Sequence, residues 1–151
     1  MKFMINGAVT LGTLDGANVE IHEAVGDENM ILFGMKTPEV NELKKTGYFP
    51  ESFYHNNAKI RKTLDFINSN LISGKSFPEI GQTIKNHDPY MVLADFADYS
   101  LAQKKAEELF SDKDVFNRMS LYNIAGAGIF AADRSINDYA RDIWHTVPAK
   151  K

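Results

Sequence analysis

Residues 1–21 read MKFMINGAVTLGTLDGANVEI, and this stretch carries the clearest fold signals of the chain. Its apolar start is stopped by Gly7, a residue typical of helix C-termini. Residues 8–13 alternate apolar and smaller side chains, a pattern that indicates a short β-strand. Asp15-Gly16 marks a turn, and a helix is predicted over residues 17–24. The opening stretch therefore predicts a strand followed directly by a helix.

Two further apolar runs extend this pattern. Residues 30–33 lie between Asn29 and Gly34 and are typical of a buried strand. Residues 90–94 (YMVLA) are predicted as a third strand, followed by a long helix. Because helical patterns separate these runs, we expect an α/β fold with a parallel sheet of about three strands and many flanking helices. We treat residues 1–151 as a single region.

The amino-acid composition excludes several classes of protein for this chain. The 151 residues carry a net charge of −3 and no cysteine, which excludes disulfides and cysteine-bound metals. No basic field for nucleic acid and no apolar run long enough for a membrane span is visible. We therefore expect a soluble cytoplasmic protein with no nucleic-acid or membrane partner.

One glycine motif resembles a cofactor site. The segment GAGIFA places Gly126, Gly128 and Ala131 in the dinucleotide-binding pattern G-x-G-x-x-G/A. That pattern needs a strand before it and an acidic residue about 20 positions later. Here a helical stretch precedes the glycines and the sequence stops too soon, so we interpret them as a helix end at which two glycines adopt unusual backbone angles.

The titratable residues give weaker signals. The four histidines are too far apart in the sequence to suggest a metal site, and none is predicted. Asp95 and Asp98 follow the predicted strand 90–94, where sites of α/β proteins often lie. Capping of the next helix explains these two residues better, and Asp15 is expected to cap the helix over residues 17–24.

Lys2 is a candidate for a different chemistry. A lysine amine forms a Schiff base with an aldehyde cofactor when it is deprotonated and held in place. Residue type alone gives Lys2 no such role, because a terminal lysine is ordinarily solvated.

Four stretches together resemble one family. They are residues 1–21, ENMILFG (28–34), VLADFADY (92–99) and NIAGAGIFAADRSINDYARDIW (123–144). They resemble the C-terminal region of the α-glucan phosphorylases, which include the glycogen, starch and maltodextrin enzymes. The resemblance covers essentially the whole chain, and its first 21 residues are the most specific part.

The resemblance implies a cofactor, a reaction and a fold. Lys2 corresponds to the family's lysine that binds pyridoxal 5′-phosphate (PLP) through a Schiff base. The family cleaves terminal α-1,4-glucosidic bonds with inorganic phosphate and releases glucose 1-phosphate, and the PLP phosphate takes part in proton transfer. The implied fold is part of a Rossmann-like sheet, the C-terminal portion of a GT-B C-terminal domain.

The sequence departs from the family in what precedes the lysine. The family's glycine-rich segment that meets the PLP phosphate, and the groups that hold substrate, are absent from this sequence. We expect the chain to start inside a domain, one residue before the PLP lysine, and to be inactive alone. Its expected partners are the rest of a phosphorylase chain, with α-glucan and phosphate in the parent. We also expect self-association through the apolar stripe 136–144.

Two alternatives to this interpretation stay open. The chain could be a free-standing, non-catalytic α/β module that binds a protein partner through an exposed face. It could also be a stand-alone PLP enzyme, which is disfavoured because such an enzyme needs a phosphate-binding loop of its own, and we find none.

Overall fold

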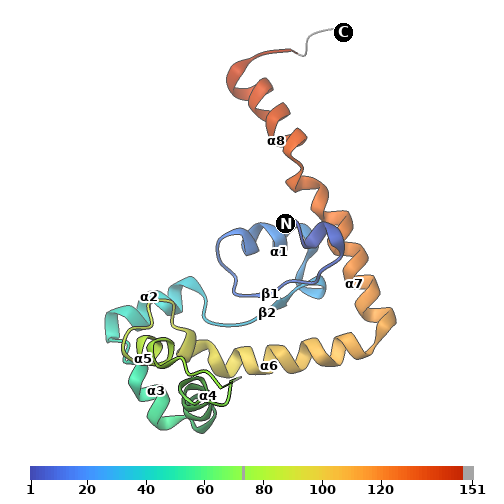
Figure 1. The fold of residues 1–151 in the computed structure, drawn as a ribbon. Coiled ribbons are helices and arrows are strands. Elements are labelled where there is room, and N and C mark those ends of the chain that lie inside the picture. Colours follow the sequence, from blue (N-terminus) through green and yellow to red (C-terminus); the bar gives the residue numbers. More distant parts are fainter. Residues whose placement is uncertain (73, 148–151) are drawn as a thin grey trace. The chain divides into compact units, whose positions relative to one another are not determined.

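The computed structural model describes residues 1–72 and 74–147, which are mostly helical with a small parallel sheet (Figure 1). The chain divides into two compact units. Unit 1 comprises Met1–Leu32 and Lys105–Lys151, and unit 2 comprises Phe33–Lys104. The long helix α6 (Val92–Ser111) contributes residues to both. No helix in the described ranges combines the length and the apolar content that a membrane span requires.

The sheet of unit 1 is a short β–α–β arrangement. Strand β1 (Leu11–Gly12) pairs in parallel with β2 (Ile31–Leu32), and helix α1 (Ala17–Val25) lies between them in the chain. In this register Leu11 is opposite Ile31. The first two predicted strands and their parallel pairing are thus confirmed, although each strand is shorter than expected.

The other elements of unit 1 are helical turns and helices. Asp112 caps the N-terminus of the long helix α7. Its carboxylate accepts hydrogen bonds from the N–H groups of Asp114 and Val115 at 3.2 and 3.1 Å. These elements are η1 (Met4–Asn6), η2 (Asp27–Asn29), α7 (Lys113–Gly126), η3 (Ala127–Phe130), α8 (Ala132–Tyr139) and the π-helical turn η4 (Ala140–Trp144).

The core of unit 1 joins its two stretches of chain. The buried apolar residues are Met4, Ile21, Val25, Met30 and Ala127. Asn123 on α7 has no exposed surface, and its Nδ2 donates to the carbonyl oxygen of Asn29 at 2.7 Å and to that of Met119 at 2.9 Å. This buried amide ties α7 to η2, and the bond is protected from competition by water.

The named elements of unit 2 are helices, and an isolated antiparallel bridge pairs Ile72 with Lys75. Three of its helices have proline at the first or second position, where the missing N–H costs no helical hydrogen bond. Ile60, Leu64 and Leu93 form its buried centre. The helices are α2 (Thr37–Thr46), α3 (Pro50–Asn56), α4 (Ala58–Asn68), α5 (Pro78–Asn86) and the first part of α6.

The predicted strand over residues 90–94 is wrong, so the sheet in the described part of the chain has two strands rather than three. Val92 and Leu93 are the first residues of α6, and their N–H groups donate to the carboxylate of Asp88 at 3.0 and 2.8 Å. A carboxylate at this position satisfies N–H groups that a helix start leaves free. A short apolar run is compatible with a buried strand and with a helix start. Here the Asp88 carboxylate caps the segment and favours the helix.

Candidate functional site

Lys2 lies on an exposed turn that leads into η1. Its carbonyl oxygen accepts a hydrogen bond from Asn6 Nδ2 at 2.7 Å. Met4 is 1% exposed and inserts into the core of unit 1, whereas Phe3 and Ile5 are 81% and 59% exposed. The turn is therefore anchored by one side chain and presents the lysine at the surface beside two apolar groups.

Gly7 fixes the end of this turn. It has a φ of +82°, and its N–H donates to the carbonyl oxygen of Met4 at 2.9 Å. A Cβ atom at this position would lie 2.3 Å from the Oγ of Ser120 on α7. Both the left-handed backbone and the close approach to α7 favour glycine here, so the predicted stop after the opening apolar run is confirmed.

Lys2 presents a primary amine at the surface of unit 1. Among the residues that the structure describes, Lys2 forms no salt bridge. A lysine that forms a Schiff base must be deprotonated and held in place. Lys2 is a primary amine, which is the chemical group that an aldehyde cofactor requires.

The turn between β1 and α1 is held by side chains, but not as expected. Asn18 Nδ2 donates to the carbonyl oxygen of Thr13 at 2.9 Å, and the hydroxyl of Thr13 donates to the Asp15 carboxylate at 3.2 Å. The predicted capping role of Asp15 is wrong, because Gly16 precedes the helix and no side chain caps it. Gly16, with a φ of +48°, lets the chain change direction where an L side chain would be strained.

Asp95 and Asp98 lie on α6, not after a strand. Their carboxylates accept hydrogen bonds from the N–H groups of Met35 at 2.9 Å and Gly34 at 2.6 Å. Burial raises the pKa of Asp95, the Met35 N–H opposes that rise, and the charges of nearby acids add to it. These residues fasten a loop of unit 2, and the helix-capping role expected of them belongs to Asp88.

The glycine motif has a structural role. Gly126 ends α7 and Gly128 lies in η3, so a helix precedes the motif and the helix end is confirmed. The expectation of unusual backbone angles is wrong for Gly126, which has a helical φ of −69°. A Cβ on Gly126 would lie 3.0 Å from Val25 Cγ1 and 3.1 Å from the carbonyl oxygen of Ala24. This glycine therefore allows α7 to pack closely against α1.

The histidines are not gathered into one site. His22 Nε2 is 2.5 Å from a carboxylate oxygen of Asp27, and His55 Nε2 is 3.6 Å from one of Glu51. Within residues 1–72 and 74–147, no cluster of three histidine or acidic side chains could hold a metal ion.

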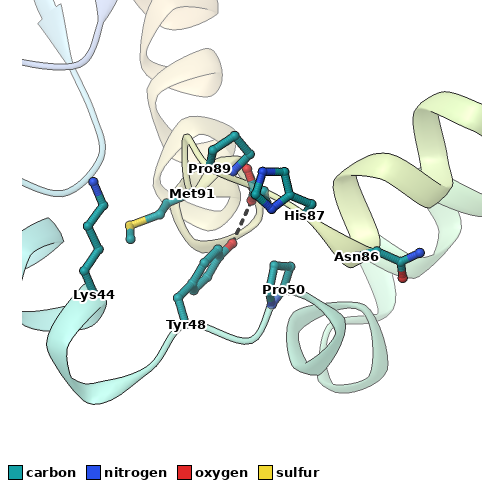
Figure 2. Close-up of a pocket in the computed structure, with 8 residues that line it drawn as sticks. Lys44, Tyr48, Pro50, Asn86, His87, Pro89 and Met91 are labelled. Atoms are coloured by element: carbon teal, nitrogen blue, oxygen red, sulfur yellow. Dashed lines mark hydrogen bonds between the residues drawn. The ribbon is translucent and has the colours of Figure 1, made fainter.

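Unit 2 contains a pocket that the sequence did not reveal (Figure 2). It has a volume of about 310 Å³. Figure 2 shows Lys44 and Asn86 on opposite sides, with Tyr48 and Pro50 between them. Its polar lining residues are Lys44, Tyr48, Asn86, His87 and Asp88, and its apolar ones are Pro50, Pro89 and Met91.

Asp88 organises this pocket. It is 5% exposed and accepts three hydrogen bonds, from the Tyr48 hydroxyl at 2.7 Å and from the two N–H groups at the start of α6. Burial raises the pKa of Tyr48, and the hydrogen bond to Asp88 raises it further. The phenol therefore stays protonated and keeps donating to Asp88. In the sequence, the feature that could have pointed to this arrangement is Asp88-Pro89 before an apolar run, which is compatible with a helix start.

Met91 gives the pocket a strained wall. Its φ is +57°, an uncommon conformation for a bulky residue, and its side chain is 3% exposed. The buried side chain and the adjacent cap hold this backbone in place.

Together, a parallel β–α–β arrangement, a helical unit and an exposed lysine on an anchored turn define a mostly helical α/β protein. The family model described as carbohydrate phosphorylase matches residues 1–146. The chain belongs to the carbohydrate phosphorylase family.

Curated relatives agree with this assignment. The chain is 44% identical over 151 residues to a glycogen phosphorylase of Synechocystis, covering 98% of this chain and 18% of the relative. It is 41% identical to a glycogen phosphorylase of Chlamydia pneumoniae over 154 residues, covering 99% and 18%. It is 39% identical over 154 residues to the human muscle form of glycogen phosphorylase, covering 100% and 18%. The chain thus spans 18% of the length of these relatives.

Proposed function

We propose that this chain is part of an α-glucan phosphorylase that cleaves α-1,4-glucan with inorganic phosphate and releases glucose 1-phosphate. Support comes from relatives named glycogen phosphorylase that align over nearly all of this chain. In this proposal, residues 1–151 form one region within the C-terminal domain of a cytoplasmic enzyme. The parallel pair β1–β2 belongs to a larger Rossmann-like sheet of that domain.

Lys2 is the residue proposed to hold PLP covalently. The observation that carries this assignment is its exposed amine on a turn that Met4 anchors, at the position that the family resemblance assigns to the cofactor lysine. When bound, the phosphate group of PLP supplies proton transfer to and from the substrate phosphate.

The residues of this chain contribute attachment and placement. Met4, Gly7 and Asn6 fix the backbone around Lys2. Placement of a reacting group lowers the entropic part of a barrier. Groups that hold the substrate belong to the rest of the phosphorylase chain, which is the proposed partner. The isolated chain is therefore expected to release no glucose 1-phosphate from glycogen and phosphate.

A chimera tests this proposal directly. The segment of the Synechocystis relative that aligns with this chain is replaced by residues 1–151, and glucose 1-phosphate release from glycogen is measured. PLP is then trapped with borohydride and its position is mapped by mass spectrometry. We expect an active chimera with PLP on Lys2.

Matched variants make the result specific. Lys2→Ala should abolish both trapping and activity, whereas Lys59→Ala, a change of an exposed lysine on α4, should alter neither. Trapping of PLP elsewhere in the active chimera would refute the role of Lys2. A folded chimera with neither PLP nor activity would favour the alternative of a non-catalytic module.

A further inference from the structure

The turn that precedes β1 contains a chemically labile pair of residues. Asn6 is followed by Gly7, and glycine follows asparagine at no other position of the sequence. Asparagine is thermolabile, because the next backbone nitrogen can attack its side-chain amide. A following glycine favours this attack, since it has no side chain to shield the nitrogen and leaves the backbone free to rotate. Asn6 is exposed in unit 1, so water reaches its side chain.

The reaction at this pair is deamidation. The nitrogen of Gly7 bonds to Cγ of Asn6, the Cγ–Nδ2 bond breaks, and the proton of the Gly7 N–H leaves with the ammonia. The product is a succinimide ring. Water then adds across either of the ring's C–N bonds and gives aspartate or isoaspartate. The net change consumes water, releases ammonia and leaves a carboxylate at this position, and it needs no oxidant, reductant or cofactor.

The folded turn restrains both reacting groups. The Gly7 N–H donates to the carbonyl oxygen of Met4 at 2.9 Å, and Asn6 Nδ2 donates to that of Lys2 at 2.7 Å. The first hydrogen bond must break before the Gly7 nitrogen can lose its proton. The second opposes the rotation that brings Cγ of Asn6 to that nitrogen. Attack is therefore confined to the times at which η1 is open.

Few contacts oppose the opening of η1. The element has three residues, of which Met4 is the buried one. Its neighbour Ile5 is 59% exposed and contributes little anchoring. Short segments with few buried apolar contacts open locally at a lower cost in free energy than the whole fold. The burial of Met4 therefore determines how often the pair becomes reactive.

We propose that Asn6–Gly7 is a site of spontaneous deamidation, that opening of η1 controls its rate, and that the product loosens the turn that carries Lys2. The product lacks the amide that donates to the Lys2 carbonyl oxygen, and it places a carboxylate near that oxygen. Isoaspartate also lengthens the backbone by one carbon atom, which displaces the Gly7 N–H from Met4. Any consequence for a cofactor on Lys2 rests on the proposed function, whereas the deamidation does not.

Peptide mapping of the whole chain tests the site and its control by the turn. The chain is kept in mildly alkaline buffer, either folded or unfolded in urea, and deamidation is followed by mass spectrometry. We expect conversion at Asn6, and slower conversion in the folded chain than in urea. Asn70 is the internal control, because it is exposed, lies outside the helices and is followed by leucine. Equal rates at Asn6 and Asn70 in urea would overturn the site, and equal rates at Asn6 with and without urea would overturn the control by η1.

A matched pair of variants tests the role of the anchor. Met4→Ala should speed deamidation of the folded chain at least about tenfold, because a buried methionine side chain contributes more than that factor to the equilibrium between closed and open states. Ile5→Ala removes an exposed side chain and should leave the rate unchanged. Circular dichroism verifies that both variants fold, and equal rates in the two would overturn the role of Met4. If Met4→Ala does not fold, the comparison with urea still decides whether η1 controls the rate.

Hydrogen exchange tests the effect of the product on the turn. Asn6→Asp reproduces the aspartate product, and the amide of Gly7 should then exchange faster than in the natural chain. Unchanged exchange would overturn the loosening of the turn. These readouts need no PLP, so they succeed or fail independently of cofactor trapping at Lys2.

Discussion

Replacement of Gly126 by alanine tests how closely α7 packs on α1. The added Cβ would lie 3.0 Å from Val25 Cγ1, 3.1 Å from the carbonyl oxygen of Ala24 and 3.3 Å from Met4 Cε. The carbonyl belongs to the backbone of α1 and cannot move alone. The core around the turn that carries Lys2 must therefore shift to admit one methyl group.

Two opposing effects determine how much Gly126→Ala changes the free energy of unfolding. Overpacking a core costs about 1–3 kcal/mol of unfolding free energy. Alanine in place of a helical glycine returns up to about 1 kcal/mol. We therefore expect Gly126→Ala to destabilise unit 1 by between about 0 and 3 kcal/mol.

Gly128 offers a matched control, because a Cβ there meets no atom within 4 Å. Gly128→Ala shares much of the gain from reduced backbone freedom without the clash. The difference between the two variants in urea unfolding, followed by circular dichroism, should be about 1–3 kcal/mol, with Gly126→Ala the less stable. Equal stability of the two variants would show that α7 and α1 are not in close contact at Gly126.

Three further perturbations address other parts of the chain. Asp88→Ala should lower the stability of unit 2 by about 2 kcal/mol in urea unfolding, because the α6 cap is lost, and Tyr48→Phe should cost less; equal costs would contradict the capping role. The pKa of Asp95 is raised above its ordinary 3.8 in the folded state, so its contribution to stability is present below that pH and is lost as pH rises through the folded pKa. Asp95→Asn should therefore gain stability relative to the natural chain between acidic and neutral pH, and a pH-independent difference would refute this. Ile143 and Trp144 are 61% and 56% exposed, so Ile143→Ser should reduce self-association in light scattering, and a natural chain that stays monomeric at high concentration would contradict the expectation.

Local signals in the sequence predicted part of the fold well. Gly7 ends the first turn, and the runs around Leu11 and Ile31 form a parallel pair. Each of these features depends on neighbouring residues and on backbone conformations that glycine permits. Such features can be predicted from the sequence because the residues that determine them lie within a few positions of them.

The errors arose where a distant residue or a competing cap decided the outcome. Residues 90–94 have the composition of a strand, but the carboxylate of Asp88 caps a helix that begins at Val92. The Tyr48–Asp88 bond joins residues 40 positions apart, so no local pattern announces the pocket. Lys2 differs again, because its proposed role comes from family resemblance and not from any spacing in the sequence.

The division of unit 1 into two stretches of chain has a consequence for the order of folding. Unit 2 is continuous in sequence, whereas unit 1 needs α7 to meet η2, and the Asn123–Asn29 hydrogen bond spans 94 positions. Closing so long a loop is entropically costly and slows contact formation. During synthesis the helices of unit 2 can therefore pack together first. The turn that carries Lys2 folds later, because Met4 becomes buried only after α7 has formed.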